Sequence, residues 1–289
     1  MTWRLAPLVS ALSPRKWLYL MLTVHNFTYG LLTPGLAYLL SVLGSFLGLR
    51  CTARAQAHTG GSRIRWLVLG SVAIGSAGIW VMHFIAILGY SVPGHTIRFN
   101  VPLTVLSMLI AVAVTMVGLF IVSSGGDTTP RLLIGGVITG VGVASMHYMG
   151  IAAMRLDGRM QFSPVLFIAS VVIAVVAATV ALWFALRLRN IWSTVGAALI
   201  MGVAISGMHY TGMAAMKMYP VAPGTLVATA GASAEGFLLP LILGISILAF
   251  VLTALIALSP SEEEIRAEAA LTERIASLER NAGGPRYRG

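Results

Sequence analysis

The sequence predicts an all-α integral membrane protein with seven transmembrane helices, built from three repeated helix hairpins plus one extra helix. Of its 289 residues 57% are hydrophobic and 10% charged, and the mean hydropathy is +0.89, a composition that soluble domains do not have. The apolar runs are continuous and long enough to cross about 30 Å of hydrocarbon as helices. Barrel strands would instead alternate apolar and polar residues, so helices are predicted.

Seven apolar runs are long enough to span a membrane. In chain order they are residues 34–50, 66–90, 101–122, 132–154, 164–186, 191–216 and 237–258. The first begins at Pro34, a residue suited to the first helical turn. Together the runs define a predicted membrane domain over residues 25–258.

Shorter segments are predicted at both ends. In residues 1–24 the apolar stretch WLYLML (17–22) is too short to span, so we expect an interfacial segment, or a true start at Met21. Residues 259–289 form a charged tail. It is predicted to be helical at 262–280, because Ser261 followed by Glu264 is a helix-start pattern.

Charge indicates how the chain lies in the membrane. The net charge of +10 comes from basic residues in short loops at helix ends, which predicts contact with anionic lipid rather than with nucleic acid. Arginines after spans one, three and five favour an outer N-terminus and a cytoplasmic C-terminus. Arg4, Arg15 and Lys16 oppose this orientation. The single cysteine, Cys51, excludes intrachain disulfides and thiolate metal clusters.

A motif of Met, His and an aromatic residue recurs in three spans. It stands in WVMHFIAILGY (80–90), ASMHYMGIAAM (144–154) and SGMHYTGMAAM (206–216). The histidines are 64 and 62 residues apart, which is the length of two spans with their loops. The predicted repeat is therefore a hairpin whose second helix carries the motif.

Small residues flank each motif histidine on its own helix face. Three positions after the histidine the sequence has Ala86, Gly150 and Gly212, and such residues let another helix approach closely. Seven positions after it the same face is predicted to carry Tyr90, Met154 and Met216. We therefore expect His83, His147 and His209 to face inward onto a packed seam, with Met154 and Met216 as possible additional ligands.

The absence of acidic residues and lysines from the interior of the predicted spans excludes several classes of membrane protein. All nine acidic residues and both lysines lie outside the predicted spans or at their ends. A carboxylate proton relay, a retinal Schiff base and a hydrolase triad are therefore excluded. Imidazole and thioether remain, and these ligands suit copper first and haem iron second. The glycine-rich seam favours the smaller group, copper.

Other histidines differ in their expected roles. His25 lies before the first span, on the side where the motifs are expected, and is a possible additional ligand. His95, in the loop after span two, is a second possibility. His58 lies in a loop on the opposite side and is expected to be solvated.

These three motifs resemble the MHYT domain, a bacterial integral-membrane sensor module. The resemblance covers about residues 25–258 and implies a multi-pass signalling input domain of the bacterial cytoplasmic membrane, which is not an enzyme. It also implies copper near the outer face, with O2, CO or NO as possible ligands. Carried onto this sequence, the resemblance names Met82, His83, Met146, His147, Tyr148, Met208, His209 and Tyr210.

The chain departs from the family pattern in three places. Phe84 and Ile85 replace Tyr and Thr in the first copy, and Met149 replaces Thr in the second. A metal site built on Met and His is compatible with these changes, whereas a role that needs three phenols is not. Family members often carry cytoplasmic output domains after the last span, and none is recognisable here, so we expect a stand-alone member that signals to an unknown cytoplasmic partner.

The predicted function is thus a membrane sensor that binds copper through Met82, His83, Met146, His147, Met208 and His209. Two other functions stay open: a copper-handling or transport protein, and a haem-binding redox protein.

Overall fold

The computed structural model describes residues 23–125, 128–156, 158–188, 190–219, 230–258, 270–275 and 277–278. Within them seven helices are long and apolar enough to cross a membrane, which confirms the predicted all-helical multi-pass class. In the predicted tail helix 262–280, residues 270–275 and 277–278 are described and are helical. The rest of this predicted helix and residues 1–22 lie outside the described residues.

The helices follow the predicted order. They are α3 (Leu32–Ala57), then α4 (Gly60–Val72), η1 (Ala73–Val81) and α5 (Met82–Leu88) as one continuous span, α6 (Val101–Ser123), α7 (Thr128–Ala153), α8 (Pro164–Arg187), α9 (Ile191–Ala215), and η2 (Ala234–Leu238) continuing into α10 (Leu239–Leu258). Two of these begin at capping asparagines. The Asn100 side chain accepts from the Leu103 amide and that of Asn190 from the Trp192 amide.

Some boundaries differ from the prediction. The first helix continues to Ala57 and the second begins at Gly60, because the arginines that were assigned to a loop extend both helices past the apolar part. The last span begins at Ala234, which places Glu235 in its first turn. Residues 73–81 form a π-helix, in which hydrogen bonds run from i to i+5, directly before the first motif.

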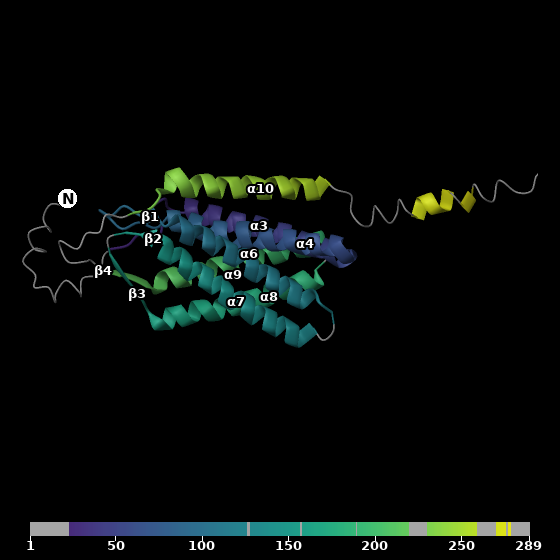
Figure 1. The fold of residues 1–289 in the computed structure, drawn as a ribbon, viewed down its shortest axis with the longest axis horizontal. Helices are drawn as coiled ribbons and strands as arrows, with labels where there is room; N and C mark the ends of the chain where they lie inside the picture. The colour runs from purple at the N-terminus through teal and green to yellow at the C-terminus, as the bar shows by residue number, and fades with distance from the viewer. Residues whose placement is uncertain are drawn as a thin grey trace, which may run out of the picture. The chain divides into compact units, whose positions relative to one another are not determined.

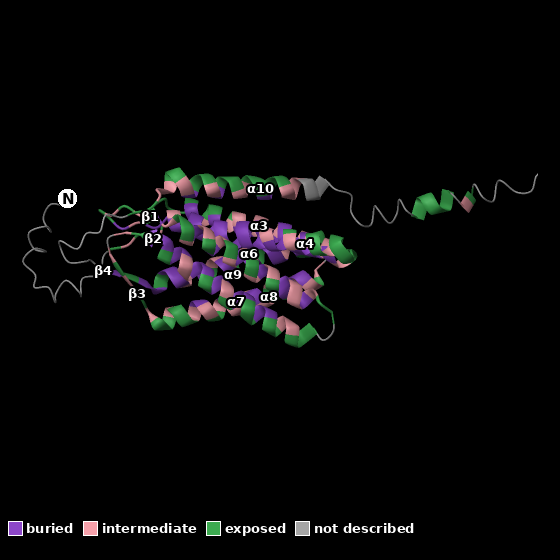
Figure 2. Cartoon of the chain, viewed as in Figure 1, coloured by how far each residue is buried: buried purple, intermediate pink, exposed green. Residues whose placement is uncertain are grey.

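Six spans pack into a closed ring. α3 contacts the η1–α5 span, which contacts α6, and the ring continues through α7, α8 and α9 back to α3. This order places the three motif-bearing helices, α5, α7 and α9, alternately with α3, α6 and α8. Figure 2 shows buried residues along the helices of the bundle, whereas residues 239–250 of α10 are mostly exposed or half-buried. Within the described residues the ring is therefore complete without α10, the predicted extra helix.

Each hairpin is closed by strand pairing at the same end (Figure 1). β1 (Arg98–Phe99), before α6, pairs with β2 (Met154–Arg155), after α7. β3 (Arg159–Phe162), before α8, pairs with β4 (Met216–Tyr219), after α9. In the first hairpin a single bridge joins His25 to Ser91. We call this end of the bundle, which holds all three pairings, the strand end.

Close helix contacts depend on glycines in η1. Gly78 lies against Gly44 and Ser45 of α3, and Gly75 against Ala111 and Val112 of α6. A side chain at Gly44 would overlap the backbone of Gly78. Backbone approach of this kind is how helices pack within a bilayer, where the hydrophobic effect does not drive them together.

Candidate metal centre

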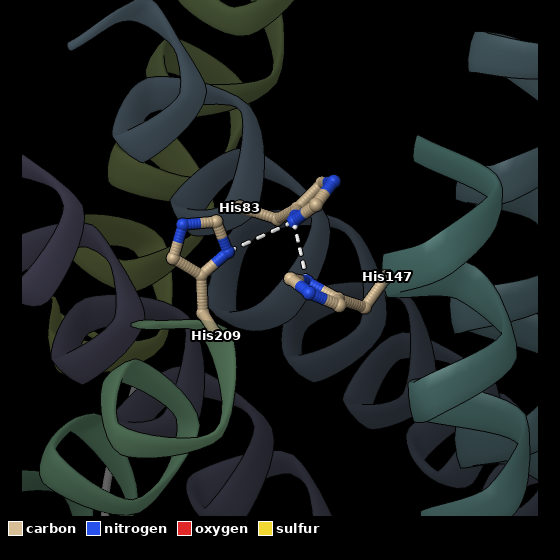
Figure 3. A group of neighbouring side chains, drawn as sticks. All are labelled: His83, His147 and His209. Carbon is tan, nitrogen blue, oxygen red and sulfur yellow. Dashed lines mark hydrogen bonds between the residues drawn. The ribbon is translucent and has the colours of Figure 1, made fainter. Parts of the chain in front are cut away.

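The three motif histidines meet inside the ring. His83 comes from α5, His147 from α7 and His209 from α9, and their rings point toward one another (Figure 3). The Nδ1 atom of His83 lies 3.0 Å from the Nδ1 of His147 and 3.0 Å from the Nδ1 of His209. One imidazole from each hairpin therefore converges on a single point.

Aromatic packing fixes the orientation of the imidazoles. Their centroids lie 4.8, 5.0 and 5.1 Å apart, and every pair is arranged edge to face. Each imidazole also packs edgewise on the aromatic residue that follows it, at 4.8 Å for Phe84 and 4.9 Å for Tyr148 and Tyr210. Since this contact needs only a ring, phenylalanine can replace tyrosine in the first copy.

The outward-pointing Nε2 atoms rest on neighbouring helices. The His83 Nε2 lies against Gly150 of α7, and the His147 Nε2 lies against Gly212 of α9, so a Cβ at either glycine would overlap the ring. Glycine three positions after the histidine thus makes room for the imidazole of another hairpin. Among the described residues none of the three Nε2 atoms has a hydrogen-bond partner.

The nitrogen arrangement fits a metal ion. A ring nitrogen has either one proton or one lone pair, so the His83 Nδ1 cannot form two ordinary hydrogen bonds at once. A metal would accept a lone pair from each Nδ1 instead. Nitrogens about 2.0–2.1 Å from one ion lie about 3.3–3.6 Å apart, so a small widening from the observed 3.0 Å would admit it. Within the described residues these histidines are the one such group of His, Cys, Asp or Glu.

The methionines of the motifs occupy a different face. Met82, Met146 and Met208 are at most 2% exposed. A residue adjacent to a histidine on an α-helix points about 100° away from it. Met208 lines an apolar cavity of about 50 Å³ between η1, α6, α7, α8 and α9. Metal ligation by these three methionines stays a prediction.

Met154 and Met216 do not continue the helix face of the histidines. The helices end at Ala153 and Ala215, and both methionines lie in strands, where they pair with Phe99 and Phe162. Each helix therefore ends one residue before the predicted bound, because residue 154 or 216 begins a strand, and a ligand role for these two methionines stays a prediction. Both side chains are nonetheless buried.

The two motif tyrosines differ in their hydroxyl partners. The Tyr148 hydroxyl lies 2.6 Å from the Ser170 Oγ of α8. The Tyr210 hydroxyl has no partner among the described residues, and its ring lies 5.6 Å from that of Phe27. The Tyr148 hydroxyl is thus engaged by a neighbouring helix.

Histidines outside the motifs lie elsewhere. His25 is exposed and bridges Ser91 through backbone hydrogen bonds, and the His95 Nδ1 lies 3.2 Å from the Pro93 carbonyl. The His58 Nδ1 lies 2.8 Å from the Arg54 carbonyl, in the connection between α3 and α4. The metal-ligand group of the described residues includes none of the three.

Comparison with known proteins identifies the family of the chain. A family model described as the MHYT bacterial signalling protein N-terminal repeat matches residues 77–135 and 140–198. The chain belongs to the MHYT family. The two matches begin at residues 77 and 140, in or just before the first two motif helices, and their spacing agrees with the 64 and 62 residues between the motif histidines.

Several MHYT relatives are signalling proteins. The chain is 34% identical over 245 residues to the bifunctional diguanylate cyclase/cyclic di-GMP phosphodiesterase MucR of Pseudomonas aeruginosa, covering 83% of this chain and 35% of MucR. It is 34% identical to the cyclic di-GMP phosphodiesterase NbdA of the same organism, over 68% of this chain and 25% of NbdA. For the signaling protein YkoW of Bacillus subtilis the identity is 31%, over 67% of this chain and 25% of YkoW.

The chain thus spans about a third of MucR and a quarter of NbdA and YkoW. No solved structure matches it. The similarity and the seven spans make it an MHYT membrane sensor domain of the kind found in signalling proteins.

Proposed function

We propose that this MHYT domain is a signalling input module that binds one copper ion through His83, His147 and His209. The observation that supports this proposal is the convergence of three Nδ1 atoms from three separate hairpins. Helix packing alone would not require the nitrogen atoms of buried imidazoles to face one another. A bound ion would require it, because the ion would accept a lone pair from each of the three Nδ1 atoms.

The charge of the surroundings favours copper as Cu(I). Apart from Glu235 in the first turn of the last span, no acidic residue lies in the seven spans. The cost of burying an ion rises with the square of its charge, so a monovalent ion is favoured where no carboxylate compensates. Imidazole is a suitable ligand for copper. In the divalent state, too, copper is bound more strongly than the other first-row metals.

Haem is disfavoured at this centre by the spacing of the rings. The Nδ1 atoms lie 3.0 Å apart and the imidazoles pack edge to face, which leaves no gap for a macrocycle between them. Haem binding elsewhere in the bundle would give a Soret band in the purified protein.

We further propose that the strand end faces outward and that the input is a diatomic gas. Bound copper would supply a coordination position for O2, CO or NO. The three histidines would hold the ion, and the aromatic rings beside them, Phe84 buried and Tyr148 and Tyr210 half-buried, would limit the access of water. The names of MucR and NbdA suggest that the response concerns cyclic di-GMP, made or degraded by another domain or partner.

Copper analysis of the purified protein tests this function. After loading with Cu(I) under reducing conditions, we expect one copper per chain, and no retained copper in the His83→Ala, His147→Ala, His209→Ala triple variant. The matched control replaces three histidines outside the cluster, His25, His58 and His95, and should retain one copper. A single substitution, His147→Gln, keeps the side-chain volume closer to native, and thermal unfolding shows whether each variant is folded.

Equal copper in the cluster variant and the control would overturn the proposal. Copper accumulation in cells that lack the protein would indicate copper handling instead of sensing.

A further inference from the structure

The apolar cavity that Met208 lines lies about one helical turn from the histidine centre. Its volume is about 50 Å³. Its wall includes the residue four positions before each motif histidine, namely Ile79, Val143 and Ile205. Four residues of an α-helix rise about 6 Å. The motif helices run toward the strand end, so the cavity lies next to the histidines on the side away from that end.

The wall of the cavity offers water too few partners. Among the described residues that line it, Thr115 and Thr139 have polar side chains and none is charged. The Thr115 hydroxyl donates to the Ala111 carbonyl at 2.7 Å. The Thr139 hydroxyl donates to the Val114 carbonyl at 3.2 Å. A buried water makes two to four hydrogen bonds, and apolar cavities stay dry, so this cavity favours an apolar occupant.

The size of the cavity restricts that occupant further. An apolar cavity of about 150 Å³ binds benzene or xenon. The cavity described here has about a third of that volume. It is therefore too small for an aromatic ring or a lipid chain, and an ion would lose its hydration without gaining a partner. The ligand class that fits is an uncharged gas molecule of two or three atoms.

An apolar groove on the outer surface of α8 and α9 leads toward the cavity. It has a volume of about 290 Å³, and Val176 and Ile200 on its wall are 58% and 55% exposed. Groove and cavity share three lining residues, Ala177, Met201 and Ala204. Apolar molecules leave water for hydrocarbon. A gas dissolved in the bilayer would thus reach the cavity wall without crossing a polar layer.

We propose that this cavity binds O2 or a gas of the same size and polarity, taken from the bilayer. Binding in the cavity does not require a metal. Its use as a store of gas beside the histidine centre rests on the proposed function, in which copper in that centre holds the gas. Gas binding is therefore tested on copper-free protein.

Paramagnetic relaxation by dissolved O2 tests the proposal. Met82, Met146 and Met208 have the same position in the three repeats and are at most 2% exposed, and of these Met208 lines the cavity. Full-length copper-free protein in nanodiscs, labelled with 13C at the methionine methyl groups, is measured by NMR under N2 and under O2. We expect a several-fold larger increase in relaxation rate at the Met208 methyl than at the other two.

A matched pair of substitutions tests the position of the site. Ala178 lines the cavity and Ala185 does not, yet both lie on α8 and are 8% and 4% exposed. We expect Ala178→Val to fill the cavity and remove the additional relaxation at Met208, and Ala185→Val to keep it. Thermal unfolding shows whether each variant is folded.

Equal relaxation of the three methyl groups in the native protein would overturn the gas site. Additional relaxation at Met208 that persists in folded Ala178→Val would overturn it as well. Copper content reports the proposed function separately. One copper per chain without a Met208 effect would contradict the gas site alone, and a Met208 effect without copper binding would contradict the copper function alone.

Discussion

His83 has the central position among the three histidines, because the two short contacts in the cluster both involve its Nδ1. It is also the histidine whose following aromatic residue is Phe84 and whose helix begins directly after a π-helix. The Phe84 ring contacts Trp80 at 4.7 Å as well as His83, and the Trp80 indole donates to Ser107 of α6. The position of His83 is thus set by packing that the other two copies do not have.

Gly150 allows a test of how closely the imidazoles must pack. A Cβ at this position would overlap the His83 Nε2 and displace a proposed ligand. We expect Gly150→Ala to lower Cu(I) affinity by about 10- to 100-fold, as changes around a ligand commonly do. Competition with a Cu(I) chelator measures the affinity.

Gly207→Ala is the control for this substitution. Gly207 lies on the motif helix α9, and a Cβ there would meet nothing within 4 Å. Equal affinities in the two variants would show that the glycine does not position His83.

The convergence of the three histidines could be predicted from the sequence. An imidazole within hydrocarbon needs a partner, and three histidines at the same position of three repeats imply that they share one partner. The two roles that the sequence did not predict are those of the aromatic residue and the glycine. The spacing of three residues places Gly150 on the same helix face as His147. The structure shows that Gly150 makes room for the imidazole of His83, which belongs to another hairpin. Which hairpin a residue contacts depends on the order of helices around the ring, and spacing along the chain does not contain that order.

At the scale of elements, the glycine contact between α3 and η1 should be essential for packing. A Cβ at Gly44 would overlap the Gly78 backbone, which cannot move without shifting a helix. We expect Gly44→Ala to lower the free energy of unfolding by about 1–3 kcal/mol, the usual cost of overpacking. Thermal unfolding in detergent gives the change in Tm.

Gly35→Ala on the same helix is the comparison. A Cβ at Gly35 would meet nothing within 4 Å, and alanine has the higher helix propensity. We therefore expect no loss of stability for this variant, and a loss equal to that of Gly44→Ala would argue against the packing explanation.

Span number and hairpin repeat followed from hydropathy and motif spacing, but two elements did not. The strand pairs involve as few as two residues each, so no alternation is long enough to indicate them. The π-helix has the same apolar composition as an α-helix and differs from it in its i to i+5 hydrogen bonds, which hydropathy does not indicate.

For the whole molecule, orientation can be tested by cysteine labelling. Arginines at the end opposite the strands predict that this end is cytoplasmic. In a Cys51→Ser background, we expect Thr96→Cys, at the exposed strand end, to react with a membrane-impermeant maleimide in intact cells. Ser124→Cys, at the opposite end, should react only after permeabilisation. The reverse pattern would place the histidine centre nearer the cytoplasm.

Each of the three covalently joined hairpins contributes one histidine, a candidate metal ligand, to the centre of the ring. The hairpins follow one another around the histidines as the subunits of a ring-shaped trimer would, and α10 is not part of this ring. A single hairpin contributes one imidazole and cannot coordinate an ion through several nitrogens. Copper would therefore be bound only when the three hairpins are correctly assembled. The copper content of the protein would then report whether a change in the packing of one hairpin has moved its histidine out of the centre.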